Sequence, residues 1–179
     1  MKIYIIGSVA SGKTTLAKRT EMIDIPYKSL DEVVYEPDKS SVWGNKKRPA
    51  EERDRMFNRI VQQENWIVED VGRPCFSEGL KQADMIILLE IPLRIRKRRI
   101  ALRWIKQRLG IEKSLYAPRY EMLKCMLGWA KGYDAGKDEL FERLIPYGDK
   151  LVVLQNQKET DDFIRSLQGA GTVKMSIVN

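Results

Sequence analysis

The feature that most constrains this chain is the segment of residues 7–15, Gly-Ser-Val-Ala-Ser-Gly-Lys-Thr-Thr, which directly follows the apolar run of residues 3–6. It matches the pattern of a glycine, a four-residue spacer, Gly-Lys and then Ser or Thr, which forms a phosphate-binding loop between a strand and a helix. Glycine lets the backbone turn tightly, so successive amides can point at phosphate oxygens with the positive end of the next helix behind them. The sequence therefore predicts a buried strand, a phosphate-binding loop at residues 7–15 and a helix over residues 12–21.

The phosphate-binding loop also predicts the ligands of the site. We expect the chain to bind ATP and Mg²⁺, with Lys13 reaching the β- and γ-phosphates as a point charge and the Thr14 hydroxyl binding the metal. Lys13 is therefore also a candidate catalytic residue. The residues of the loop that we expect to bind ATP are Gly7, Ser8, Ala10, Ser11, Gly12, Lys13, Thr14 and Thr15.

Apolar runs alternate with helical patterns along the rest of the chain, which implies an α/β fold with a parallel sheet. Polar residues 36–49 contain two prolines and a glycine, so we expect a mobile loop that covers a substrate. A helical insert at residues 118–147 should break near Gly132 and Gly136. Strands are predicted at residues 3–6, 28–30, 66–68, 85–89 and 151–154, and further helices at residues 50–64, 92–109 and 160–168.

Length and composition indicate one domain, at residues 1–168, with a lid at about residues 92–147 and a tail at residues 169–179 to which we assign no role. No segment approaches the roughly 20 apolar residues of a membrane span, so we expect a soluble, cytoplasmic protein without a membrane partner. The chain has no histidine and only two cysteines, which we expect to be buried. This composition argues against a disulfide framework, a Cys/His zinc site and histidine acid–base chemistry.

The formal net charge of +7 is concentrated in residues 94–108, which hold eight basic residues and no acidic one. Such a segment attracts anions, either the phosphates of a nucleotide or a nucleic-acid backbone. Arg96, Arg99 and Arg103 fall within an arc of about 60° on one face of the predicted helix, since each residue turns the helix by about 100°. We expect the three to form a phosphate clamp, with Arg96 binding ATP and Arg99 and Arg103 acting in catalysis. A neighbouring apolar face should dock the helix on the core and comprises Ile95, Leu102, Ile105 and Leu109.

Carboxylates follow two of the predicted strands, at the edge where open α/β sheets bind ligands. Glu69 and Asp70 follow the strand of residues 66–68, and one of them should hold a magnesium-bound water; we favour Glu69 over Asp70. The alternative is a solvated acidic pair. Asp31 follows the strand of residues 28–30, where it could accept a proton from an incoming hydroxyl or bind the acceptor. A helix cap for residues 32 onward is the competing interpretation of Asp31.

With these features, the chain resembles the small P-loop kinases related to adenylate and shikimate kinases. Residues 5–15, 65–69 and 105–110 are similar to segments of the bacterial DNA topology modulation proteins, and that similarity spans roughly residues 1–168. The resemblance implies a three-layer P-loop fold with a five-stranded parallel sheet in the order 2-3-1-4-5, and a basic helical lid whose arginines close over ATP. It also implies that Arg73 binds a phosphate of the acceptor. Adenylate kinases have Asp-Gly-Phe-Pro-Arg where this chain has Glu-Asp-Val-Gly-Arg at residues 69–73, which argues against AMP as the acceptor.

Two alternative functions are consistent with this sequence. The first is a kinase that transfers the γ-phosphoryl group of ATP to a small hydroxyl or phosphate acceptor. The second is a nucleotide-gated DNA-binding or regulatory protein, for which residues 94–108 supply the phosphate contacts. A GTPase switch is disfavoured because the Asn-Lys-x-Asp signature is absent; residues 45–48, Asn-Lys-Lys-Arg, lack the carboxylate that would recognise guanine.

Overall fold

A five-stranded parallel sheet forms the centre of the computed structural model, which describes residues 1–20, 25–38, 40–41, 43–112 and 118–175. Its strands lie in the order β2-β5-β1-β6-β7, and every neighbouring pair is parallel. Counted along the chain among these strands alone, the order is 2-3-1-4-5, so the predicted topology is confirmed. The strands are β1 Lys2–Gly7, β2 Tyr27–Ser29, β5 Trp66–Asp70, β6 Met85–Leu89 and β7 Leu151–Leu154.

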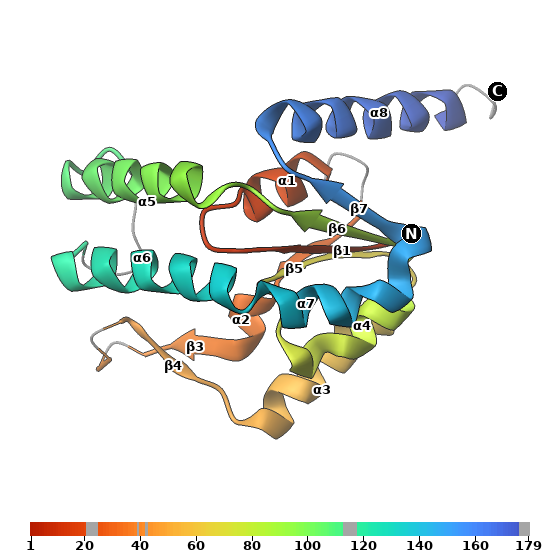
Figure 1. Ribbon diagram of the computed structural model, residues 1–179. Coiled ribbons are helices and arrows are strands. Elements are labelled where there is room, and N and C mark those ends of the chain that lie inside the picture. The colour runs from red at the N-terminus through yellow and green to blue at the C-terminus, as the bar shows by residue number, and fades with distance from the viewer. Residues whose placement is uncertain (21–24, 39, 42, 113–117, 176–179) are drawn as a thin grey trace.

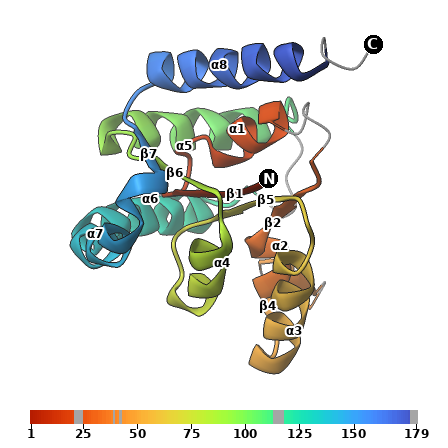
Figure 2. The ribbon, with the colours of Figure 1, turned by 90° about the vertical axis from the view of Figure 1, so that its right-hand side faces the viewer.

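Helices cover both faces of the sheet and complete a three-layer α/β fold (Figures 1 and 2). One face carries α1 Lys13–Thr20, α5 Leu93–Arg108 and α8 Gln157–Met175. The other face carries α2 Leu30–Val34, α3 Ala50–Val61, α4 Ser77–Gln82, α6 Tyr120–Ala135 and α7 Lys137–Leu144. Two short 3-10 helices, η2 Pro74–Phe76 and η3 Ile145–Lys150, precede α4 and β7.

The central strand β1 has side chains in both halves of the core because successive side chains of a strand point to opposite faces. Tyr4 and Ile6 are buried in the cluster that α2, α3, α4 and α7 cover. Ile3 and Ile5 are buried in the other cluster, with residues of α1 and α8. Burial on both faces explains why the central strands appear in the sequence as unbroken apolar runs, which is typical of parallel sheets.

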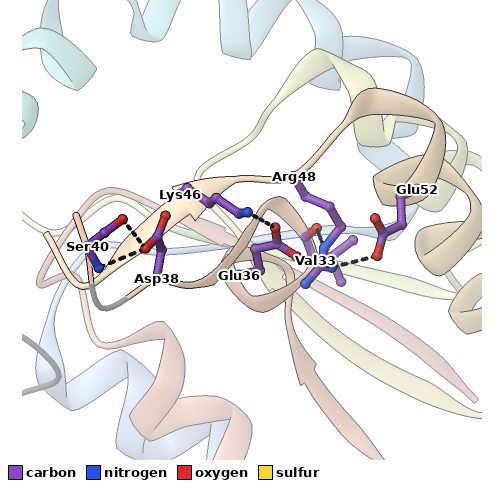
Figure 3. A network of polar contacts seen from close by, with 7 residues as sticks. All are labelled: Val33, Glu36, Asp38, Ser40, Lys46, Arg48 and Glu52. Carbon is purple, nitrogen blue, oxygen red and sulfur yellow. Dashed lines mark hydrogen bonds and ion pairs between the residues drawn. The ribbon is translucent and has the colours of Figure 1, made fainter.

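Residues 36–49 differ from the mobile loop that we predicted, because they contain most of an antiparallel hairpin, β3 Tyr35–Pro37 and β4 Asn45–Lys47. Charged contacts hold the hairpin against its neighbours (Figure 3). Glu36 pairs with Lys46 at 3.2 Å and with Arg48 at 3.0 Å, and Arg48 also pairs with Glu52 of α3 at 2.7 Å. These strands are short and polar, so they lack the apolar alternation that would have indicated them in the sequence.

Several element boundaries also differ from the prediction. The helical insert breaks at Gly136 alone, since Gly132 lies inside α6. The last helix begins before residue 160 and extends beyond residue 168 to Met175. Residues 113–117 of the predicted lid and residues 176–179 of the tail lie outside the described residues. Within the described part of the chain, no helix is both long and apolar enough to cross a membrane.

The two cysteines are less buried than we predicted. Cys75 is exposed and Cys125 is half-buried, and both are free thiols. Cys75 lies in the short helix η2, directly before α4, where only its neighbour Phe76 reaches the core.

Candidate nucleotide and acceptor site

The phosphate-binding loop connects β1 to α1, and two of its residues have positive φ angles. Gly12 has a φ of 106°, and Ala10, which is not a glycine, has a φ of 58°. A non-glycine residue in the left-handed region is uncommon, and such residues gather at ligand-binding turns. Successive amides in turns of this kind form a concave anion-binding nest. Gly7 is required for packing, since a Cβ there would lie 2.6 Å from Ser11 Oγ.

Lys13 begins α1 and folds back over the loop, where its Nζ donates to the Ser8 carbonyl oxygen at 3.0 Å. Burial lowers the pKa of Lys13, while the nearby charge of Glu69 raises it in part. Lys13 is partly buried and forms no ion pair with the described residues, so an incoming anion would stabilise its ammonium group. The geometry therefore suits a phosphate close to Nζ.

Thr14 and Glu69 lie together at the carboxyl edge of the sheet. Thr14 Oγ1 donates to Glu69 Oε1 at 2.8 Å, and the Tyr27 hydroxyl donates to the same oxygen at 2.5 Å. Burial and the hydrogen bond to Glu69 raise the pKa of Tyr27, which keeps the phenol protonated as a donor. Glu69 is 5% exposed, and its Oε2 has no hydrogen-bond partner among the described residues.

This pair of side chains fits a magnesium site. Mg²⁺ usually binds to one or two protein oxygens and completes its shell with water and substrate phosphates. The described residues contain no cluster of three or more His, Cys, Asp or Glu side chains that could hold a metal alone. An unpaired, buried carboxylate oxygen beside a threonine hydroxyl is what a water-mediated magnesium contact needs.

A cavity of about 640 Å³ opens from the phosphate-binding loop between α1, α5 and α8. Leu102 of α5 and Ile164 of α8 supply apolar surface to this cavity, and Arg99, Arg103 and Gln157 supply polar groups. A volume of this size, with mixed lining, is typical of a site for a small organic ligand. Because it is continuous with the loop, it can hold the rest of a nucleotide whose phosphates the loop binds.

The basic helix α5 does not present one clamp of three arginines. Arg99 and Arg103 line the cavity, where Arg99 donates to the Ser11 carbonyl oxygen at 2.8 Å and Arg103 donates to Glu112 at 2.9 Å. Arg96 is 2% exposed and does not line this cavity. The structure therefore does not place Arg96 beside the other two, because its guanidinium is enclosed by Ser8 of the loop and by Ala130 and Asp134 of α6.

The predicted apolar docking face of α5 is also mostly wrong. Leu102, Ile105 and Leu109 are 46%, 45% and 68% exposed, and Ile95 alone packs against the core. The reason is visible in Figure 1, where α5 and α6 extend together beyond the edge of the sheet. Only the first turns of α5 therefore lie over the core.

A second charged cluster lies beside the loop, at the ends of β2 and β5. Arg73 pairs with Asp31 and with Asp70, whose side chain is fully buried. Asp70 also accepts hydrogen bonds from the backbone amides of Gly72, at 2.8 Å, and Arg73. Burial lowers the pKa of Arg73, but the charges of Asp70 and Asp31 outweigh it and raise that pKa overall.

Asp31 is not the cap of a helix, which was the competing interpretation. The N-cap of α2 is Ser29, and Asp31 lies in the first turn with its side chain 64% exposed. A carboxylate that is open to solvent and held toward an arginine is available to a ligand. The structure thus brings Asp31 and Arg73 together, and their roles toward an acceptor stay predictions.

Glu69 and Asp70 are adjacent in β5, so their side chains lie on opposite faces of the sheet. Glu69 is in register with Ile5, whose side chain lies on the face covered by α1, and Asp70 with Ile6, whose side chain lies on the other face. The solvated acidic pair that competed with the magnesium hypothesis is ruled out, since the two residues are 5% and 2% exposed. Of the two, Glu69 is the residue beside Thr14.

Some residues of the site were missed in the sequence. Gln157, Glu112 and Lys106 line the cavity, and Gln157 accepts a hydrogen bond from Arg99 at 2.9 Å. Gln157 starts α8 close behind β7, so the rule that ligands bind at the carboxyl ends of parallel strands could have indicated it. Tyr27 gave no such signal, because its contact with Glu69 depends on the pairing of β2 with β5.

The sheet order, the helices on both faces and the phosphate-binding loop after the central strand define a P-loop α/β fold. Comparison with solved structures agrees. The chain is similar to shikimate kinase from Acinetobacter baumannii in complex with shikimate, with 13% identity, a TM-score of 0.57, and coverage of 99% of this chain and 95% of that chain. Such a likeness shows a shared fold.

Two further matches are shikimate kinases from Bacteroides thetaiotaomicron and Aquifex aeolicus, with identities of 17% and 16% and TM-scores of 0.48 and 0.49. They cover 95% and 96% of this chain and 97% and 99% of their own chains. No protein-family model matches this chain, and no curated protein matches it in sequence. Membership of the DNA topology modulation family therefore stays a prediction.

Proposed function

We propose that this chain is an ATP-dependent phosphotransferase that transfers the γ-phosphoryl group of ATP to an oxygen of a small acceptor. One observation carries the proposal: Lys13, Thr14 and Glu69, our candidates for binding phosphate and Mg²⁺, lie near the separate charged cluster of Asp31 and Arg73. The two sites meet at the carboxyl ends of β1, β2 and β5. Phosphoryl transfer needs two substrates in line with each other, and this arrangement provides a place for each.

On the ATP side, the loop amides and Lys13 would bind the phosphates, and the base would lie between Leu102 and Ile164. Thr14 would bind Mg²⁺ directly and Glu69 would hold it through a water. When bound, the ion neutralises charge on the β- and γ-phosphates and fixes their orientation. Arg99 is held at the loop by two backbone carbonyls, at 2.8 and 3.3 Å, so little movement separates it from the phosphates.

On the acceptor side, Arg73 would bind an anionic group and Asp31 would bind or deprotonate the attacking group. The acceptor oxygen forms a bond to the γ-phosphorus as the bond from that phosphorus to the β–γ bridging oxygen breaks, and ADP leaves. For a hydroxyl acceptor, the proton passes to Asp31. For a phosphate acceptor, no base is needed at neutral pH.

The shared fold supplies a first acceptor class to test. The Acinetobacter baumannii enzyme is a shikimate kinase in complex with shikimate. Hydroxylated cyclic acids therefore belong in the panel beside nucleotides, nucleosides and sugars. A carboxylate or phosphate on such a compound would compete with Asp31 and Asp70 for Arg73.

The test is to incubate the protein with ATP, Mg²⁺ and each acceptor class while following ADP release and the phosphorylated product. The control is Lys13→Met, which removes the point charge but keeps an apolar stem of similar length. We expect a product with one acceptor class and no turnover by the variant. ADP release without any phosphorylated acceptor would show a slow ATPase, and undiminished turnover by the variant would refute the site assignment.

No specific observation among the described residues favours the DNA-binding alternative. Within the basic segment of residues 94–108, Arg96 is buried, Arg99 contacts the loop and Arg103 pairs with Glu112. These three arginines therefore have partners within this chain. Lys106 also lines the cavity that we assign to the nucleotide. We therefore do not propose DNA binding.

A further inference from the structure

Arg96 is the most buried cation of the described residues, and its partners come from three separate parts of the chain. It lies in the second turn of α5 and is 2% exposed. Its Nε donates to the Ile91 carbonyl oxygen at 2.8 Å, before the helix begins. Its Nη1 donates to Ser8 Oγ in the phosphate-binding loop and to the Ala130 carbonyl oxygen at 3.2 Å, and its Nη2 pairs with Asp134.

These contacts connect the loop to α6. Ser8 is 1% exposed, so its hydroxyl is enclosed with the guanidinium. Ala130 and Asp134 lie one turn apart near the end of α6. A guanidinium holds its donors in a rigid planar fork, so a displacement of one partner changes the geometry offered to the others. A buried charge must also keep its partners, because solvent cannot replace them.

We propose that Arg96 is a positioning residue that couples the phosphate-binding loop to α6, so that nucleotide affinity depends on Asp134. The inference rests on the proposed nucleotide site and makes its affinity depend on α6. A displacement of α6 would move Asp134 and, through it, Arg96, and would change the hydrogen bond that Arg96 donates to the Ser8 hydroxyl. By linkage, a nucleotide that orders the loop must stabilise the same position of α6.

Asp134 suits the test because it lies outside the cavity that we assign to the nucleotide. It does not line the cavity of about 640 Å³, and it lines a different cavity of about 320 Å³ with Arg96 and Tyr133. A purely structural ion pair makes a different prediction. It would lower the stability of the fold when broken but would leave the affinity of the folded protein for nucleotide unchanged.

The experiment measures the Kd for Mg·ADP by calorimetry, well below the melting temperature of each variant. We expect Asp134→Asn to weaken binding about 5- to 20-fold, within the usual range of coupling between sites. The matched control is Asp138→Asn, an exposed carboxylate in the first turn of α7, which should bind like the wild type. Ser8→Ala and Asp134→Asn together should show a non-additive effect, because both act through Arg96.

Two further variants keep the test decisive. Asp134→Glu retains the charge beside Arg96, displaces it by one methylene group and serves if the asparagine variant does not fold. In an Arg96→Lys background, the interaction between the Ser8 and Asp134 substitutions should vanish. Unchanged Mg·ADP affinity in folded Asp134 variants, or strictly additive effects, would overturn the coupling alone. Failure of the wild type to bind Mg·ADP would overturn the proposed function as well.

Discussion

Replacing Asp70 with asparagine tests how the acceptor side is held together. The Asp70 side chain is fully buried and accepts hydrogen bonds from the Gly72 amide and from the amide and guanidinium of Arg73. Breaking a buried ion pair costs about 3–5 kcal/mol, and one hydrogen bond to a charged group contributes about 1.5–3 kcal/mol. Because Arg73 is 22% exposed and keeps Asp31 as a partner, the lower range applies. We expect the free energy of unfolding to fall by about 2–3 kcal/mol.

Urea unfolding and thermal melting measure this loss, and a chain of this size should melt about 4–12 °C lower. The matched control is Asp31→Asn, since Asp31 pairs with the same Arg73 but is 64% exposed. An exposed pair contributes at most about 1 kcal/mol, so the control should melt within about 4 °C of the wild type. Equal destabilisation by the two substitutions would refute the view that Asp70 is the anchor and Asp31 the ligand-facing partner.

Four other outcomes test the site. Asp31→Asn should lower phosphorylation of a hydroxyl acceptor about 10²- to 10⁴-fold in steady-state kinetics, while ATP binding stays near normal. Arg99→Ala and Arg103→Ala should each lower kcat by about 100-fold, more than they raise KM for ATP, because they act where charge develops. Gly72→Ala should reduce the free energy of unfolding by about 1–3 kcal/mol in urea titration, since Gly72 has a φ of 91° and an added Cβ would lie 2.8 Å from a side-chain atom of α7. Because burial lowers the pKa of Lys13 and bound phosphates would raise it, nucleotide binding should take up protons at alkaline pH. Affinity should then fall as the pH rises through the pKa of Lys13 in the free protein, and calorimetry in buffers of different ionisation enthalpy measures the proton uptake.

Much of the fold was predictable because its strongest signals are local. The strands at residues 85–89 and 151–154 match β6 and β7 at both ends, since parallel strands buried on both faces read as apolar runs. The hairpin of β3 and β4 was not predictable in this way. Its strands have three residues each, and Arg48, directly after β4, connects them to the helices by a hydrogen bond to the Val33 carbonyl oxygen of α2 and an ion pair with Glu52 of α3. No period in the sequence reveals these contacts.

The site, like the fold, has one part that the sequence predicts and another that depends on the tertiary structure. The sequence by itself determined that Lys13 and Thr14 stand at the start of a helix behind a glycine-rich loop, because that motif is one short continuous segment. Only the tertiary structure decided which arginine faces which partner. Arg73 meets Asp31 across 42 residues, and Arg96 meets Asp134 across 38 residues. Helical spacing placed Arg96 on the same face as Arg99 and Arg103, but the spacing does not specify what packs against that face. In the structure, α6 and Ser8 of the loop enclose Arg96.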